Sequence, residues 1–224
     1  MSRKAGGPHY VWLLLLALML YLPLDGGDDS GCGVLDDDSG TLSWERLWIR
    51  YATPAGVLLA GVLLLVCYGF ALQLPFFRDD LPIMTWLQGR GWREIWLHAN
   101  ENSFYRPLAF TIYKLGLFLP VGARQMVLHA LPLLIQWGSA FLLIKVIQLC
   151  GYSAGRGVLA ALLFVMFPFN YNALPWVTAL SHPLVTMLTL LAVYGALRAV
   201  REKAVRWWGL SLLATALAPF SHES

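Results

Sequence analysis

The sequence predicts an all-α protein, a polytopic bundle of about five to six membrane helices with an outer loop that carries interfacial helices. Composition is the first reason, because 58% of the 224 residues are hydrophobic and only 13% are charged. So few polar side chains cannot cover a water-soluble domain, which normally has about 25% charged residues. The second reason is a series of apolar runs, several near the length of about twenty residues that a helix needs to cross hydrocarbon.

Composition also sets aside other classes of protein. A chain this apolar is not disordered, collagen-like or a secreted disulfide scaffold. Cys32, Cys67 and Cys150 lie in unlike surroundings, and we interpret them as ordinary thiols. The formal net charge of +3 is too small to indicate nucleic-acid binding, so the positions of the basic residues matter more than their number.

Residues 1–50 are expected to form a short hydrophobic segment and an acidic linker. The apolar run Tyr10–Leu24 has the length of a signal-peptide core, but no small-residue cleavage site follows it. We therefore interpret it as an extra short or interfacial helix. The stretch Asp25–Asp38 ends in three consecutive aspartates without EF-hand spacing, which favours a solvated linker over a calcium site.

The membrane module, which we place at residues 51–224, contains five further apolar runs that we expect to be membrane helices. In chain order they are Pro54 to about Pro75, Val127–Gln148, Gly157–Phe169, Pro183–Val200 and Trp207–Phe220. The third and fifth runs are short for a bilayer. They either lengthen into their flanks or cross where the bilayer thins.

Basic residues predict the orientation of these helices, because lysine and arginine favour the cytoplasmic side of a membrane. Three clusters fall on one side if the helices alternate: Arg46 and Arg50; Lys145 and Arg156; and Arg198, Arg201, Lys203 and Arg206. The segments 77–126, 170–182 and 221–224 then lie together on the outer face. We expect any chemistry on that face.

The outer loop, residues 77–126, differs in character from the apolar runs around it. It alternates polar residues with tryptophans and aliphatic residues, namely Ile83, Trp86, Leu87, Trp92, Ile95 and Trp96. Indole rings prefer the headgroup layer, where the ring is in apolar surroundings and its N–H stays wet. The pattern predicts helices that lie in the membrane interface.

Asp79 and Asp80 follow the first long apolar run directly. Adjacent carboxylates raise each other's proton affinity, and a carboxylate so tuned can take a proton from a hydroxyl nucleophile. The alternatives are a solvated cap on a helix end, or a pair of which Arg78 neutralises one member. Residue chemistry alone leaves these readings open.

Arg106 lies in the sequence Tyr105-Arg106-Pro107-Leu108, where the proline predicts a helix that starts at position 107. A guanidinium at such an entrance can bind a phosphate through two parallel hydrogen bonds. The alternative is an arginine that only extends its charge to the membrane interface.

The other outer residues predict less. The turn 168–182 is polar and aromatic, and it either lines a cavity or caps helices. The histidines at positions 98, 129, 182 and 222 lack the spacing of a metal site. A Gly-rich phosphate loop, a nucleophile elbow and a CxxC motif are also missing from the sequence.

In their order along the chain, these pieces resemble the N-terminal part of the GT-C membrane glycosyltransferases, and they are most like the bacterial relatives of the transmembrane O-mannosyltransferases that carry TPR repeats. The resemblance covers residues 54–224. It rests on Arg78-Asp79-Asp80, Tyr105-Arg106-Pro107-Leu108, Ala160–Pro168, Pro175-Trp176-Val177 and Ser221-His222-Glu223-Ser224.

This resemblance implies a sugar donor carried on polyprenyl phosphate and an acceptor hydroxyl on a protein or a lipid. Asp79 or Asp80 would be the general base, and the sugar would be transferred with inversion at the outer face of a bacterial cytoplasmic membrane. A divalent metal is left open, since some relatives use one and others do not. We expect the substrate and its phosphate to meet Arg78, Tyr105, Arg106, His182 and Glu223.

The sequence also departs from the family pattern. His129, Pro132 and Gln136 stand where relatives often have His, Asn and His, and His222 stands where lysine is expected. Family members continue through further spans, so we expect a truncated chain that is about half of its enzyme. The alternative function is a non-enzymatic membrane protein, such as a transporter, flippase or assembly subunit. The uncharged runs Val57–Phe70 and Leu184–Leu197 count against coupled transport.

Overall fold

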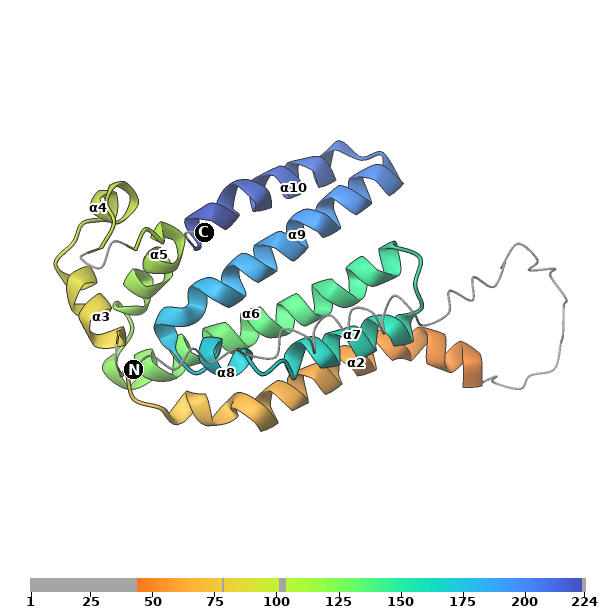
Figure 1. The fold of residues 1–224 in the computed structure, drawn as a ribbon, viewed down its shortest axis with the longest axis horizontal. Helices are drawn as coiled ribbons and strands as arrows, with labels where there is room; N and C mark the ends of the chain where they lie inside the picture. Colours follow the sequence, from red (N-terminus) through yellow and green to blue (C-terminus); the bar gives the residue numbers. More distant parts are fainter. Residues whose placement is uncertain (1–43, 78, 101–103, 223–224) are drawn as a thin grey trace, which may run out of the picture. The chain divides into compact units, whose positions relative to one another are not determined.

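The structure of the protein is a computed structural model that describes residues 44–77, 79–100 and 104–222. The expectations for the hydrophobic run 10–24, the acidic stretch 25–38, Arg78 and Glu223 fall outside these residues. All regular structure in the described part is helical, which confirms the all-α class (Figure 1). The helices are α2 (Trp44–Tyr68), η1 (Gly69–Gln73), α3 (Asp80–Gln88), α4 (Trp92–Leu97), α5 (Pro107–Gly116), α6 (Val121–Leu149), α7 (Ala154–Val165), α8 (Asn170–Ala173), η2 (Val177–Leu180), α9 (Ser181–Glu202), α10 (Val205–Leu217) and η3 (Ala218–Phe220).

Three helical stretches in the described residues are long and apolar enough to cross a membrane: Ala52–Gln73, Val121–Leu149 and Val177–Glu202. They coincide with the first, second and fourth expected spans, and they are consistent with a membrane protein. The other two expected spans are also helical, but α7 has 12 residues and α10 has 13. At 1.5 Å per residue these measure about 18 and 20 Å, less than the roughly 30 Å of hydrocarbon. The count of five to six membrane helices stays a prediction.

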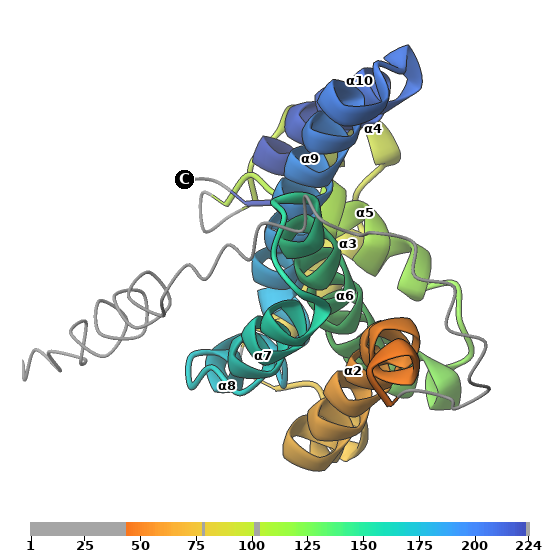
Figure 2. The ribbon, with the colours of Figure 1, turned by 90° about the vertical axis from the view of Figure 1, so that its right-hand side faces the viewer.

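Helix α6 lies between α2 and α9, and it also packs against α7, while α10 packs along α9 (Figures 1 and 2). Small residues line the closest contacts. Ala60 and Ala140 are fully buried, and a Cβ added to Gly157 would lie only 3.2 Å from the carbonyl oxygen of Ile144. Small side chains let helix backbones approach closely in a bilayer, where lipid offers no hydrophobic force between helices.

The bundle has two chemically different ends. At one end, Gln148 Nε2 donates to Thr53 Oγ1 at 2.7 Å, which joins the end of α6 to the start of α2. We call it the basic end because it holds Lys145, Arg156, Arg198, Arg201 and Arg206. At the other end, Gln125 Nε2 donates to the carbonyl oxygen of Leu74 at 2.7 Å. We call it the carboxylate end because Asp79, Asp80 and helices α3 to α5 lie there.

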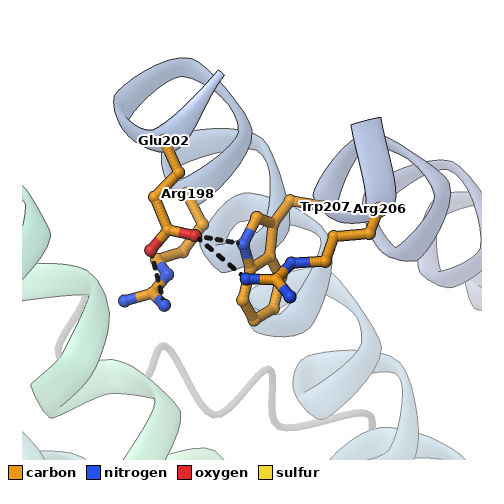
Figure 3. Close-up of polar contacts among 4 residues, drawn as sticks. All are labelled: Arg198, Glu202, Arg206 and Trp207. Carbon is orange, nitrogen blue, oxygen red and sulfur yellow. Dashed lines mark hydrogen bonds and ion pairs between the residues drawn. The ribbon is translucent and has the colours of Figure 1, made fainter. Parts of the chain in front are cut away.

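The turn between α9 and α10 is held by Glu202 (Figure 3). Its carboxylate pairs with Arg198 at 2.6 Å and with Arg206 at 3.7 Å, and it accepts a 2.6 Å hydrogen bond from Trp207 Nε1. Lys203 follows in the left-handed conformation, with φ of 51°, and ends α9. The turn therefore reverses the chain at the basic end and leaves this cluster with an excess of positive charge.

Helix α7 ends at Val165, earlier than the expected Phe169, because a side chain donates hydrogen bonds to its last carbonyl oxygens. Asn170 Nδ2 donates to the carbonyl oxygens of Phe164 and Val165 at 2.8 and 2.9 Å. Gln136 Nε2, halfway along α6, donates to Asn170 Oδ1 at 3.3 Å. Asn170 is buried and satisfies these carbonyl oxygens, whereas Met166 and Phe169 between the helix end and Asn170 remain on the surface. The buried amide network therefore fixes the end of α7 against the middle of α6.

The outer loop forms helices as expected, but their aliphatic faces pack differently from the expectation. Ile83, Leu87 and Ile95 are buried at 5%, 0% and 0% exposure, in one core with Phe110 and Tyr113 of α5. Their apolar sides meet the protein rather than the headgroup layer. Trp92 and Trp96 remain on the surface, as do Leu97 and Phe118, so these side chains are still available to a membrane interface.

We predict that Gly195→Leu destabilises the pair α9 and α10. A Cβ at Gly195 would lie 3.0 Å from the amide nitrogen of Ser211 and 3.1 Å from the carbonyl oxygen of Trp207, so a larger side chain forces two backbones apart. Overpacking of this kind costs about 1–3 kcal/mol. Thermal unfolding of the protein in detergent, followed by circular dichroism, measures the loss. Gly209→Leu on α10 is the matched control, because nothing lies within 4 Å of that Cβ position. Equal unfolding temperatures for the two variants contradict the packing.

Candidate active site at the carboxylate end

Asp80 is the most deeply placed charge of the described carboxylate end, with 1% of its surface exposed. Its Oδ2 accepts a hydrogen bond from the backbone N–H of Phe77 at 3.2 Å, and its Oδ1 accepts one from the N–H of Thr178 at 3.0 Å. A buried carboxylate is costly unless hydrogen bonds satisfy its oxygens. Asp80 meets that need with two backbone amides, and it thereby joins the start of α3 to η2.

Asp79 differs from Asp80 both in its exposure to solvent and in its hydrogen bonds. It lies on the surface at the N-cap position of α3, and its side chain makes no capping hydrogen bond. Its backbone carbonyl accepts the N–H of Ile83 at 3.2 Å, which begins the helix. The two aspartates, interchangeable in the sequence, are therefore a buried structural carboxylate and an exposed carboxylate that a substrate can reach.

Tyr113 lies beside this buried carboxylate. Its O–H donates to the carbonyl oxygen of Val177 in η2. Complete burial, and then the negative charge of Asp80, raise the pKa of Tyr113 far above its ordinary value of about 10, while the charge of Arg106 acts in the opposite direction. Tyr113 thus stays a neutral hydrogen-bond donor, and Asp80 and Arg106 are both close enough to act on it.

Arg106 directly precedes α5, which begins at Pro107 as the sequence predicts. The guanidinium carbon lies 4.5 Å from the centre of the Phe104 ring, and Nη1 donates to Ser181 Oγ at 3.3 Å. Ser181 is buried as the first residue of α9. The half-buried arginine therefore links the outer loop to the start of a long helix, next to the segment that holds Asp80.

Tyr105 and His182 are at the same end of the bundle but belong to other contacts. Tyr105 O–H donates to the carbonyl oxygen of Trp96 at 2.9 Å, and its ring lies 6.5 Å from that of Phe220. His182 is exposed, with its ring 4.6 Å from the ring of His222. His182 also lines a cavity of about 300 Å³, together with Gln136 and Asn170.

Sequence reasoning did not single out Tyr113 or Thr178. Tyr113 follows Arg106 by two helical turns, so the two residues share a face of one helix, and this spacing was the available signal. Thr178 acts through its backbone N–H, for which a side-chain pattern gives no signal. In the described residues, no group of three or more His, Cys, Asp or Glu side chains could hold a metal ion.

We predict that Asp80→Asn destabilises the fold while Asp79→Asn does not. An asparagine at position 80 keeps one acceptor oxygen but turns an N–H₂ toward a backbone N–H, which leaves buried donors without an acceptor. Such a change costs about 1–3 kcal/mol. A substitution at the exposed Asp79 stays within about 0.5 kcal/mol. The free energy of unfolding in mixed detergent micelles measures both, and an equal loss for the two variants contradicts the assignment of Asp80 as the structural member.

The raised pKa of Tyr113 predicts a dependence of stability on pH. Because the native state holds this proton more tightly than the unfolded state, the stabilisation is complete below about pH 10 and is lost as the pH rises above it. The difference in unfolding free energy between the wild type and Tyr113→Phe should therefore shrink from about pH 9 to about pH 11. The other tyrosines cancel in this difference. A constant difference across the range contradicts the prediction.

No protein-family model, curated protein or solved structure matches the chain. The fold and the site are therefore argued from the residues of this chain alone. The resemblance to the GT-C glycosyltransferases stays a hypothesis about function.

Proposed function

We propose that the protein is a membrane glycosyltransferase, or the N-terminal part of one, that transfers a sugar from a polyprenyl-phosphate carrier to an acceptor hydroxyl on a protein or lipid. One observation carries the proposal: the exposed carboxylate of Asp79 is held beside the buried, amide-bound carboxylate of Asp80, at the end of an apolar bundle opposite the basic end. The lysines and arginines of the basic end support an outer-face location for Asp79 in a bacterial cytoplasmic membrane, because such residues favour the cytoplasmic side.

In this proposal Asp79 is the general base, because both oxygens of Asp80 already accept backbone hydrogen bonds. Asp79 takes the proton from the acceptor hydroxyl as its oxygen forms a bond to the anomeric carbon. The bond from that carbon to the carrier phosphate breaks on the opposite face, and the phosphate leaves with the electron pair. The configuration of the sugar is inverted, and Asp80 fixes the position of the base.

Arg106 is the described cation best placed to offset charge on the leaving phosphate. It lies at the carboxylate end, where its charge lowers the pKa of Tyr113 and the charge of Asp80 raises it. A preorganised positive group next to a developing anion lowers the barrier without further reorganisation. Tyr105 and His182 lie at the same end and are candidates for contact with the sugar or acceptor. Arg78 and Glu223 stay candidates from the sequence.

An apolar bundle suits such a donor. A polyprenyl chain stays in the hydrocarbon layer, so an enzyme that uses it must present its reactive groups at the membrane surface. The structure puts Asp79 and Arg106 at one end of helices long enough to cross that layer. In this proposal the sugar occupies the neighbouring cavity, where Gln136 and Asn170 provide amide groups.

We predict that Asp79→Asn abolishes sugar transfer in the full protein, purified into lipid and supplied with polyprenyl-phosphate sugar and acceptor. Loss of a general base costs about 10²- to 10⁴-fold in rate, measured as release of carrier phosphate and labelling of the acceptor. Glu94→Gln is the matched control, because it also removes an exposed acidic charge from the outer loop. Its rate should equal that of the wild type.

Normal turnover by a protein that carries both Asp79→Asn and Asp80→Asn would contradict the assigned base. Absence of turnover in the wild type, with every donor tried, would favour the alternative of a non-enzymatic transporter, flippase or assembly subunit. The stability measurement on Asp80→Asn separates loss of the base from loss of the fold.

A further inference from the structure

A groove follows the contact between α2 and α6 from the basic end toward the middle of the bundle. It consists of two adjoining hollows that share Leu58 and Trp137. The hollow toward the middle of the bundle is lined almost wholly by apolar side chains, and the other opens at the basic end. The lining residues on which the argument depends are Thr53, Leu58, Gly61, Leu134, Trp137 and Lys145.

The apolar floor of this groove is built by specific packing. Trp137 Nε1 donates to the carbonyl oxygen of Val57 at 2.7 Å, which holds the indole ring across the gap between the helices. Gly61 makes room for the ring, because an added Cβ would lie 3.0 Å from Trp137 Nε1. Leu58 and Leu134 remain exposed on either side, at 65% and 55%. These side chains form an apolar channel that is open along the outer surface of the bundle.

The basic end of the groove carries a positive charge. Lys145 is half-buried there, with its Nζ 3.4 Å from Gln148 Oε1 and 5.8 Å from the centre of the Phe141 ring. Gln148 in turn donates to Thr53. Within the described residues, Lys145 forms no ion pair. An ammonium group next to neutral hydrogen-bonding side chains suits a phosphate oxygen, which lysine binds as a point charge.

The length of the groove fits one leaflet of a bilayer. From Thr53 to Leu65 it follows α2 over twelve residue steps, which at 1.5 Å each span about 18 Å. One leaflet contributes about half of a hydrocarbon layer roughly 30 Å thick. An acyl chain that starts at the basic end would therefore extend to about the middle of the membrane, where the groove ends.

We propose that this groove binds an anionic phospholipid, with its phosphate at Lys145 and one acyl chain along Gly61 and Trp137. The site is distinct from the carboxylate end and does not depend on the proposed transferase activity. Positive charge at the headgroup and an apolar channel of one-leaflet length select this ligand over a zwitterionic lipid, whose cationic headgroup lies near the same lysine. The lipid would brace the contact between α2 and α6 at the basic end.

The test measures lipid binding to the full chain in detergent by native mass spectrometry, with phosphatidylglycerol and phosphatidylcholine of the same acyl chains in competition. The wild type should prefer phosphatidylglycerol, and Lys145→Gln should reduce the preference about fivefold. Lys203→Gln is the matched control, since it removes one exposed lysine from the same end of the bundle outside the groove. Equal effects of the two variants, or displacement of the lipid by excess inorganic phosphate, would overturn the proposal.

A second measurement locates the acyl chain. Phosphatidylglycerol with a photoreactive diazirine in its chain should label the wild type within 58–65 of α2 and 133–137 of α6. Leu134→Trp fills the groove and should remove this labelling, whereas Leu212→Trp puts the same side chain on an exposed position of α10 and should preserve it. Labelling spread evenly over the exposed helices overturns a defined site. Crosslinking of a second copy through these residues in its place also overturns it, because a protein would then cover the groove.

Discussion

The separation of charge to the two ends of an apolar bundle is the constraint on which the rest of this structure depends. A helix in hydrocarbon satisfies its own backbone, but it cannot solvate ionised side chains. The long helix α6 obeys this limit, with Arg124 near one end and Lys145 near the other, and the charges of α9 gather in its last two turns. Chemistry that needs charge is thereby restricted to the ends, and the deeply buried carboxylate of Asp80 lies at only one of them among the described residues.

At the carboxylate end, one buried charge joins segments that are distant in sequence. Asp80 and Thr178 are 98 positions apart, and their hydrogen bond holds the outer loop against the segment that leads into α9. Tyr113 and Arg106 attach to the same segment through Val177 and Ser181. Fixing the backbone on both sides of Asp80 determines where Asp79 emerges. The exposed carboxylate is therefore placed by its buried neighbour.

At the basic end, hydrogen bonds and charge clusters are closer to the surface. Glu202 gathers two arginines and a tryptophan at the turn into α10, and exposed pairs of this kind contribute at most about 1 kcal/mol each. Lys145 stands apart from that cluster, at the mouth of the groove between α2 and α6. The half-buried ammonium group of Lys145 thus gives the basic end a position suited to an anionic lipid.

Much of the helical architecture could be predicted from sequence, because apolar runs and Pro107 give direct signals. The end of α7 could not be, since it depends on a contact between Asn170 and carbonyls that only the folded chain brings together. The aliphatic face of α3 was visible in the sequence, but periodicity does not reveal whether protein or lipid covers it. The burial of Asp80 and the exposure of Asp79 depend on the backbone amide of Thr178, a contact that residue types alone cannot indicate.

We expect the carboxylate end and the basic end to lie on opposite sides of a membrane. Labelling single cysteines in sealed vesicles with a membrane-impermeant maleimide tests it most directly. Native Cys150 is exposed in the turn after α6 and reports the basic end, and Asp79→Cys in a cysteine-free background reports the other. Asp79→Cys should react from the outer side, and Cys150 only after the vesicles are opened. Reaction of both from the same side would contradict it.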